Sequence, residues 1–330
     1  MATTDLAAHP PLVRLTIALR QLRPPIGWRY LGGRLLTGML AIWGAVTVVF
    51  FALYSTGNPA VLLVPPDAPR DEIDRLTALM GFDRPLPVQY VTFLGQVLSG
   101  NFPDSIRYGS DPVPIALEKL PATLALGSAG LLIGVLVGGA IGYLSATASS
   151  PWLRRGPLSV AVGLDAIPTF FFGVLLTLVF AVHLGWFPAS GGGSPAAMVL
   201  PAITLGVAFI PAIARVFRTA LVDTLPADHV RTARSKGLSR GTVMRRHVVA
   251  NSLGTSLNVV GIMSGVLLGG AVITESVFGW PGIGQLSINA VHNRDYPLVI
   301  VCVLVIAVGF VLINIVIDIL AALIEPRLRG

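Results

Sequence analysis

The sequence predicts an all-α integral membrane protein with six transmembrane helices, a large extracytoplasmic insertion after the first helix and a cytoplasmic loop between the fourth and fifth. Of its 330 residues 54% are hydrophobic and 12% are charged, whereas soluble domains carry about 25% charged residues. Apolar runs recur along the chain, and each is close to the length of about 20 residues that a helix needs to cross the hydrocarbon layer. Charge is therefore too scarce for a surface that faces water on all sides.

These runs divide the chain into segments with different expected roles. The first transmembrane helix is expected at 35–53, between a cytoplasmic tail (1–34) and a polar, proline-rich insertion (54–120). A core of five further helices covers 121–323, and 324–330 is a short cytoplasmic C-terminus. Within the core we expect spans at about 121–146, 157–182, 198–222, 252–277 and 298–323, with the cytoplasmic loop at 223–251.

The distribution of Lys and Arg predicts the orientation. With both termini inside, 17 of the 23 Lys and Arg lie on the cytoplasmic side when the stretch Arg215 to Arg246 is counted there. Cytoplasmic loops carry the excess of positive charge, so this orientation is favoured. The N-terminus lacks the apolar segment and cleavage site of a signal peptide, and we expect it to be retained inside.

The most distinctive stretch of the cytoplasmic loop is a basic island, residues 227–251, with the sequence ADHVRTARSKGLSRGTVMRRHVVAN. Gly237 suits the left-handed residue that follows a helix end, and Ser239 can cap a second helix. The pattern therefore predicts two short helices joined at a glycine corner, a candidate docking surface. Binding to anionic lipid, at about 1 kcal/mol per basic residue, is an alternative that explains the charge but not the corner.

Carboxylates inside the apolar runs are the next signal, because a charge at the bilayer centre costs about 2.5–3.5 kcal/mol on insertion scales. Asp165 precedes Pro168, where an irregular helix would expose backbone to a cavity. Glu275 is followed by a rigid Gly- and Pro-rich turn, whereas Asp318 suits an interface. The candidates for a translocation path or gate are Asp165, Pro168, Glu275, Phe278 and Pro281.

Enzyme motifs are missing from the sequence. It contains no Gly-Lys-Ser/Thr phosphate loop, no HExxH zinc motif and no Gly-x-Ser-x-Gly elbow, and its five His are scattered. The single cysteine, Cys302, allows no internal disulfide. The basic residues sit in short loops without the pattern of a nucleic-acid face. We therefore expect no catalysis, no cofactor, no metal and no nucleic-acid partner in this chain.

Short islands of sequence resemble the binding-protein-dependent ABC permeases of the dipeptide, oligopeptide and nickel branch. The coupling, or EAA, loop of that family is similar to HVRTARSKGLS followed by RRHVVANSL. Further islands agree in order and spacing across nearly the whole chain: GNPA at 57–60, FDRPLPVQY at 82–90, LPATLALG at 120–127, ESVFGWPGIG at 275–284 and RDYP at 294–297. The sequence departs from the family at His229, Ser235 and Thr255, where tyrosine, alanine and proline are usual.

The resemblance implies an assembly in the bacterial cell membrane. Its partners would be a second, homologous permease, two cytoplasmic ATPase subunits that bind ATP and Mg, and an extracytoplasmic solute-binding protein. The residues implied in coupling to the ATPase are Asp228, Arg231, Thr232, Ala233, Arg234, Lys236 and Gly237.

The expected function is import of peptides or similar small polar solutes by alternating access. Relatives handle dipeptides, oligopeptides, nickel chelates or glutathione, and no residue pattern in the spans selects among them. Two other classes remain open. A proton-coupled secondary transporter would use Asp165 and Glu275, and a membrane-embedded enzyme is disfavoured by the missing motifs.

Overall fold

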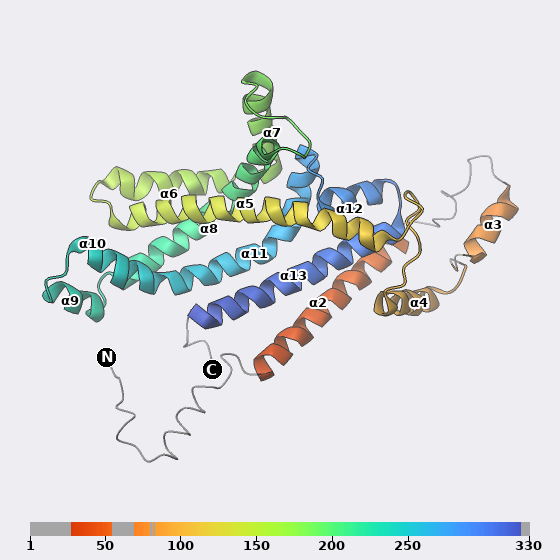
Figure 1. Cartoon of the computed structure of the whole chain (residues 1–330), viewed down its shortest axis with the longest axis horizontal. Coiled ribbons are helices and arrows are strands. Elements are labelled where there is room, and N and C mark those ends of the chain that lie inside the picture. The colour runs from red at the N-terminus through yellow and green to blue at the C-terminus, as the bar shows by residue number, and fades with distance from the viewer. Residues whose placement is uncertain (1–27, 55–68, 80, 82, 325–330) are drawn as a thin grey trace, which may run out of the picture.

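The computed structural model describes residues 28–54, 69–79, 81 and 83–324. The predicted tail over 1–27, the segment 55–68 with its GNPA motif, and the C-terminal residues 325–330 lie outside these ranges, as do the side chains of Thr255 and Asp318. Every regular element that the structure describes is a helix (Figure 1): α2 (Trp28–Tyr54), α3 (Arg70–Leu79), α4 (Leu86–Ser99), α5 (Pro112–Thr147), α6 (Pro151–Asp165), α7 (Thr169–Leu176), η3 (Thr177–His183), α8 (Pro195–Thr224), α9 (Asp228–Ser235), α10 (Arg240–Val243), η4 (Met244–Val249), α11 (Ala250–Phe278), α12 (Ile283–His292) and α13 (Tyr296–Ile324).

Four of the described helices, α2, α5, α8 and α13, are long and apolar enough to cross a membrane. Two bent pairs raise the number to as many as six: α6 with α7 and η3, bent by 103°, and the two parts of α11, bent by 57°. The all-helical membrane class is confirmed. Six uninterrupted spans are not observed, because the predicted third span at 157–182 is broken at residues 166–168.

Proline accounts for this break. Pro168 has no N–H to donate and disfavours helical geometry at the residue before it, so α6 ends at Asp165 and α7 begins after Pro168. After the 103° turn α7 packs against α8 and α11, and η3 projects from the bundle (Figure 1). An apolar run gives the right composition for one span, but one proline within it converts the run into two helices.

The helix that contains the second predicted span begins before residue 121. Asp111 caps α5 by accepting a hydrogen bond from the Val113 N–H, and the helix then runs through Pro121 without a break. Residues 112–120, which the sequence suggested as the end of the insertion, are therefore the first turns of α5. With 36 residues, α5 is about 54 Å long and exceeds the roughly 30 Å hydrocarbon layer.

The centre of the molecule is the close contact between α5 and α8. A row of glycines four residues apart lies against α8, and an added Cβ would meet atoms at 3.0 Å or less at Gly130, Gly134, Gly138 and Gly142. At Gly142 the obstructing atom is the backbone oxygen of Ala214, at 2.8 Å. Small residues at this spacing let helix backbones approach closely. The adjacent Gly139 faces open space.

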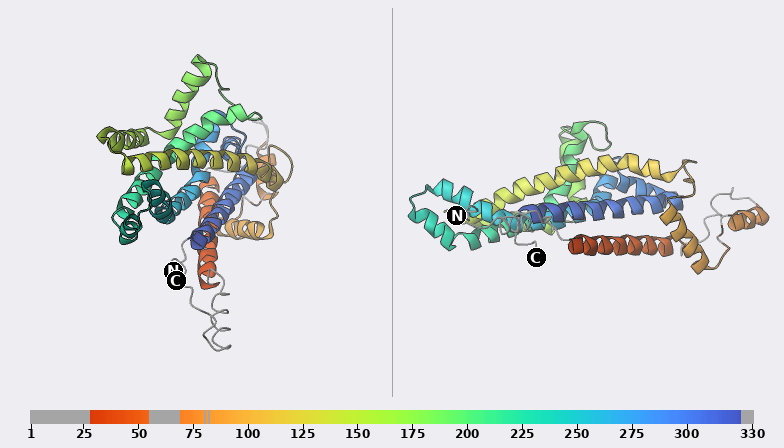
Figure 2. Two further views of the ribbon diagram at one scale, coloured as in Figure 1. Left: turned by 60° about the vertical axis from the view of Figure 1, so that its left-hand side comes forward. Right: turned by 60° about the horizontal axis from the view of Figure 1, so that its bottom comes forward.

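The bundle is elongated, with different elements at its two ends (Figure 2). α9 and α10 lie at one end and α4 at the other. At the α4 end, Phe93 packs against Phe50 of α2, with ring centroids 5.0 Å apart. The same buried cluster includes Leu298 and Tyr296 at the start of α13. α4 is thus fastened to the membrane helices through a shared apolar core.

The α5–α8 contact predicts a contrast between two adjacent glycines. Gly138→Ala places a methyl group 2.9 Å from the Ile210 carbonyl oxygen, and overpacking of this kind costs about 1–3 kcal/mol. We expect a lower thermal unfolding midpoint for Gly138→Ala in detergent. Gly139→Ala, with no atom within 4 Å of the added Cβ, should be as stable as the parent. Equal midpoints for the two variants would show that the helices are not in close contact here.

Candidate functional site

The basic island forms the two short helices that the sequence predicted. α9 ends at Ser235, and the chain turns at Gly237, whose φ of 76° is the left-handed conformation that glycine adopts readily. Ser239 then caps α10 by accepting a hydrogen bond from the Thr242 N–H. The predicted glycine corner and serine cap are both present.

One side of α9 is buried and the other is free. Val230 and Ala233 are 0% and 4% exposed and belong to an apolar cluster with Phe217 and Leu221 of α8. The remaining residues implied in coupling are exposed: Asp228, Arg231, Thr232, Arg234, Lys236 and Gly237. The resemblance implies that Ala233 shapes the corner with Gly237, and the Ala233 side chain packs into the protein's own core. α9 is therefore held by two small apolar side chains and presents a mostly charged surface.

Hydrogen bonds tie the island to the helices on either side. The Ser252 hydroxyl, on α11, is 2.9 Å from the Val248 carbonyl oxygen and 3.1 Å from that of Ala220 on α8. Its oxygen also lies 3.1 Å from Thr224 Oγ1. The exposed pair Asp228–Arg231, at 3.8 Å with both side chains more than three-quarters exposed, adds little stability. The island is held mainly by its buried apolar face and by this polar connection between α8 and α11.

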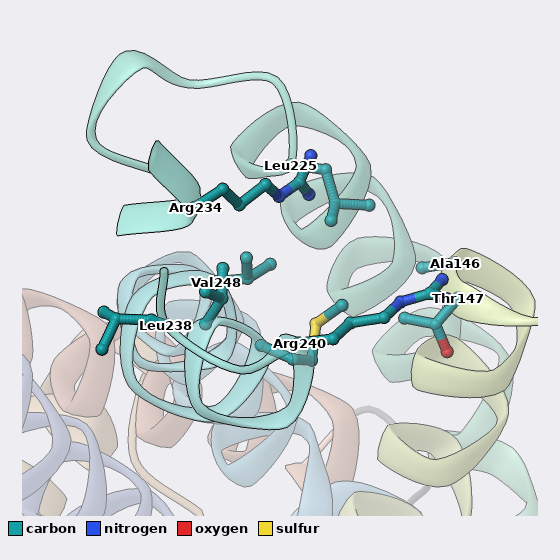
Figure 3. A pocket seen from close by; sticks show the side chains of 9 residues that line it. Ala146, Thr147, Leu225, Arg234, Leu238, Arg240 and Val248 are labelled. Atoms are coloured by element: carbon teal, nitrogen blue, oxygen red, sulfur yellow. The ribbon is translucent and has the colours of Figure 1, made fainter. Parts of the chain in front are cut away.

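A cavity of about 420 Å³ lies between the island and the C-terminal end of α5. Figure 3 shows the Arg240 side chain extending toward Ala146 and Thr147, and that of Arg234 extending toward Leu225. The rest of the lining is mostly apolar: Leu238, Val243, Met244 and Val248. The surface around α9 and α10 is therefore hollowed and carries two guanidinium groups at its edge.

At the other end, Glu275 organises the turn that the sequence singled out. Its carboxylate is fully buried, and Oε2 accepts hydrogen bonds from the N–H groups of Gly284 at 2.8 Å and Gln285 at 3.1 Å. These donors lie in the first turn of α12, where a negative charge is stabilised by the helix dipole. An added Cβ at Gly282 would collide with the same carboxylate. Glu275 therefore holds α11, the turn and α12 together.

The turn is also fastened to its neighbours. Trp280 Nε1 donates to the Ala122 carbonyl oxygen of α5 at 2.9 Å, and the Ile283 N–H donates to Thr123 Oγ1 at 2.9 Å. Phe278 is buried and lies against Gly173 of α7, while the exposed Pro281 lies beside Gly192. A role for Glu275, Phe278 and Pro281 as path or gate stays a prediction.

Asp295 has a role that the sequence analysis did not assign, although it lies in the RDYP island. It is 1% exposed, and its carboxylate accepts hydrogen bonds from the Ser105 hydroxyl and from the N–H groups of Arg107 and Leu298. Asp295 thus caps α13 and fixes the loop between α4 and α5. The signal was available, since an Asp just before an apolar run is typical of a helix cap.

The structure pairs Asp165 with a residue that the sequence analysis placed elsewhere. Arg215 Nη2 of α8 lies 3.4 Å from Asp165 Oδ2, and both side chains are about half exposed. Arg215 had been counted with the cytoplasmic loop, but α8 continues to Thr224. Arg215 lies within the expected span at 198–222, so the sequence alone could have identified it as a charged residue inside a span. Pro168 lies three residues beyond Asp165, at the start of α7.

Comparison with known proteins identifies the family. Over residues 130–330 the chain matches the family described as binding-protein-dependent transport system inner membrane component. The chain belongs to this family. It is an ABC importer permease of the dipeptide, oligopeptide and nickel branch, as the sequence resemblance indicated.

Individual relatives agree with this assignment. The glutathione transport system permease protein GsiC of Salmonella choleraesuis (strain SC-B67) is 38% identical over 287 residues, covering 86% of this permease and 93% of GsiC. GsiC of Escherichia coli (strain K12) is 34% identical over 285 residues with the same coverage. These relatives are transport permeases and not enzymes. A solved structure of the MetNI methionine ABC transporter in inward-facing conformations covers 64% of this permease and 94% of that chain, at 19% identity and a TM-score of 0.52; this likeness concerns the fold.

The contacts of Glu275 in the permease lead to a stability prediction. Glu275→Ala leaves two buried N–H donors without their acceptor, and such a loss costs about 1–3 kcal/mol. We expect a lower unfolding midpoint in detergent, followed by tryptophan fluorescence. Glu275→Gln keeps an accepting oxygen and should lose less. The matched control is Glu118→Ala, since the Glu118 side chain is 73% exposed; a Glu275→Ala protein as stable as this control would contradict the capping role.

Proposed function

We propose that this permease is one of two transmembrane subunits of an ATP-driven importer of peptides or similar small polar solutes. An external binding protein delivers the solute, and two cytoplasmic ATPase subunits bind ATP and Mg. The second transmembrane subunit is a homologous permease, and transport proceeds by alternating access. The single observation that carries the proposal is the basic island, a short helix with a buried apolar face and a free charged face at one end of the bundle.

The contacts of the basic island would couple a movement of α9 to α8 and α11. Shifting two conformations from 1:99 to 99:1 takes about 5.5 kcal/mol, which a loosely tethered loop cannot deliver to a helix bundle. Here α9 follows α8 after a short turn, packs on its last turns through Val230, and is connected to α11 through Ser252. A movement imposed on α9 by an ATPase would therefore carry α8 and α11 with it.

The proposed location is the bacterial inner membrane, with both termini and the island cytoplasmic. Support comes from the excess of Lys and Arg in the segments assigned to the cytoplasm. The island and α4 lie at opposite ends of the bundle (Figure 2), as this orientation requires. The extracytoplasmic segment with α3 and α4 would then receive the binding protein.

A proton-coupled transporter is the less favoured function. A carboxylate that carries protons must exchange them with water during the cycle, whereas Glu275 is fully buried and accepts two backbone hydrogen bonds. The relatives of known name are also permeases of binding-protein-dependent systems. Uptake that depends on ATP and persists without a proton gradient would separate the two functions.

The first prediction concerns the partner of the island. Changing Arg231, Arg234 and Lys236 to Ala removes three exposed charges from α9 and its end while leaving Val230 and Ala233 in place. We expect a tagged parent protein, purified in mild detergent from its own membranes, to retain an ATPase and a second permease. The triple variant should retain the second permease but lose most of the ATPase, measured by mass spectrometry of the eluates.

A variant of equal charge provides the control. Changing Arg240, Arg245 and Arg246 to Ala also removes three exposed positive charges from the island, but none from α9. If the island only bound anionic lipid, the two triple variants would behave alike, because each loses the same charge. Purification of the parent protein without any ATPase would refute the proposed assembly.

The second prediction concerns the glycine corner. Gly237→Val forces a β-branched residue into a φ of 76°, which strains the backbone at the corner by about 1–3 kcal/mol. The added Cβ causes no steric clash, since no atom lies within 4 Å of it. We expect normal insertion but ATP hydrolysis uncoupled from uptake. The control is Gly241→Val, which also meets no atom within 4 Å and has an ordinary φ. Normal coupled uptake by Gly237→Val would contradict the role of the corner.

A further inference from the structure

The pair formed by Asp165 and Arg215 lies at membrane depth. Asp165 is ten residues beyond Arg155 on α6, about 15 Å along the helix, and Arg215 is nine residues before the end of α8, about 14 Å. Both helices belong to segments apolar enough to cross a membrane. The two charged groups therefore lie between two and three helical turns from these reference points, within segments apolar enough to span a membrane, and yet each side chain is about half exposed.

Charged side chains at such depth do not face lipid; they face the interior of a bundle or a water-filled cavity. The backbone at the same place supports this conclusion independently. Residues 166–168 form the break between α6 and α7, with Ala166 and Pro168 exposed. Non-helical backbone at membrane depth is tolerated only where protein buries it or where it lines a water-filled cavity. An exposed break and a half-exposed ion pair are thus adjacent to each other at the end of α6.

We infer that Asp165 and Arg215 line the water-filled translocation path and bind the charged ends of a peptide-like solute, Arg215 its carboxylate and Asp165 its ammonium group. The inference rests on the proposed function and adds the chemical class that the path recognises. A guanidinium binds a carboxylate through paired N–H donors, and the 3.4 Å ion pair is loose enough to open. In the empty path the two side chains pair with each other. When a solute passes, each side chain pairs instead with the oppositely charged end of the solute.

The first test measures contact with water and needs no substrate. Asp165→Cys is made in a chain whose only other cysteine, the buried Cys302, is replaced by Ala. Native membranes are treated with membrane-impermeant thiol reagents, one anionic and one cationic. We expect labelling, with the anionic reagent about fivefold faster than the cationic one because Arg215 attracts it; adding Arg215→Gln should remove that preference. Leu136→Cys, at an exposed apolar position of α5, should stay unlabelled. An unlabelled Asp165→Cys protein would overturn the inference, because lipid or the second permease would then cover the site.

The second test measures recognition. Uptake of a short peptide with a free C-terminal carboxylate is compared with uptake of its C-terminal amide, and the N-acetylated peptide tests the ammonium end. The binding protein is the same in every assay, so its own preference cancels between parent and variant. We expect Arg215→Gln to reduce the preference for acid over amide about fivefold, and Asp165→Asn to do the same for free over acetylated peptide.

Matched controls and outcomes complete the design. Arg155→Gln and Asp223→Asn remove like charges elsewhere on α6 and α8 and should leave both preferences unchanged. Peptide uptake with unchanged preferences in Arg215→Gln and Asp165→Asn would overturn the inference while leaving the importer intact. A labelled path in a parent protein that imports no peptide would refute the proposed peptide import and, with it, the assignment of peptide ends to this pair.

Discussion

The close contact between α5 and α8 is the constraint on which the rest of the permease depends. Glycines at every fourth position of α5 remove the side chains that would hold the helices apart, so the backbone of Gly142 meets that of Ala214 directly. With little hydrophobic driving force between helices in lipid, such packing supplies much of the attraction that orders a membrane bundle. The pair also determines the geometry of both ends, since α8 leads into the basic island and α5 accepts hydrogen bonds from the Trp280 turn.

The two ends use different chemistry for different purposes. At the α4 end, Glu275 and Asp295 are buried carboxylates that accept hydrogen bonds from backbone N–H groups: Glu275 through Oε2 from the first turn of α12, and Asp295 from α13 and the loop before α5. Such sites fix one arrangement, because moving either carboxylate would leave donors unpaired. The basic island instead keeps its polar groups outside and uses small apolar side chains to hold its inner face. The α4 end is thus fixed by buried polar contacts, whereas the basic island leaves its charged groups exposed.

The sequence predicted what depends on neighbouring residues and missed what depends on distant ones. Gly237 and Ser239 were assigned correctly because turn and cap geometry are local. The break at Pro168 was indicated by proline chemistry, but its angle depends on how α6 and α7 pack on α8. The partner of Asp165 lies 50 positions away, and Arg215 was taken for a loop residue because charge alone marked the boundary. The helix of the second predicted span extends further toward the N-terminus than residue 121, because the cap at Asp111 already begins it.

The 103° bend has a consequence for the permease outside its membrane. It leaves η3 projecting from the bundle, and large side chains in and just after the bent segment, such as Phe170, Phe171 and Trp186, remain about half exposed or more. Surface of this kind is stable only against hydrocarbon or another apolar surface. A detergent micelle can surround a straight helix bundle with a simple cylindrical belt. Around this permease the belt must also enclose the projecting η3. The choice of detergent, in particular the thickness of its apolar shell, will therefore decide how well the isolated subunit keeps its native shape.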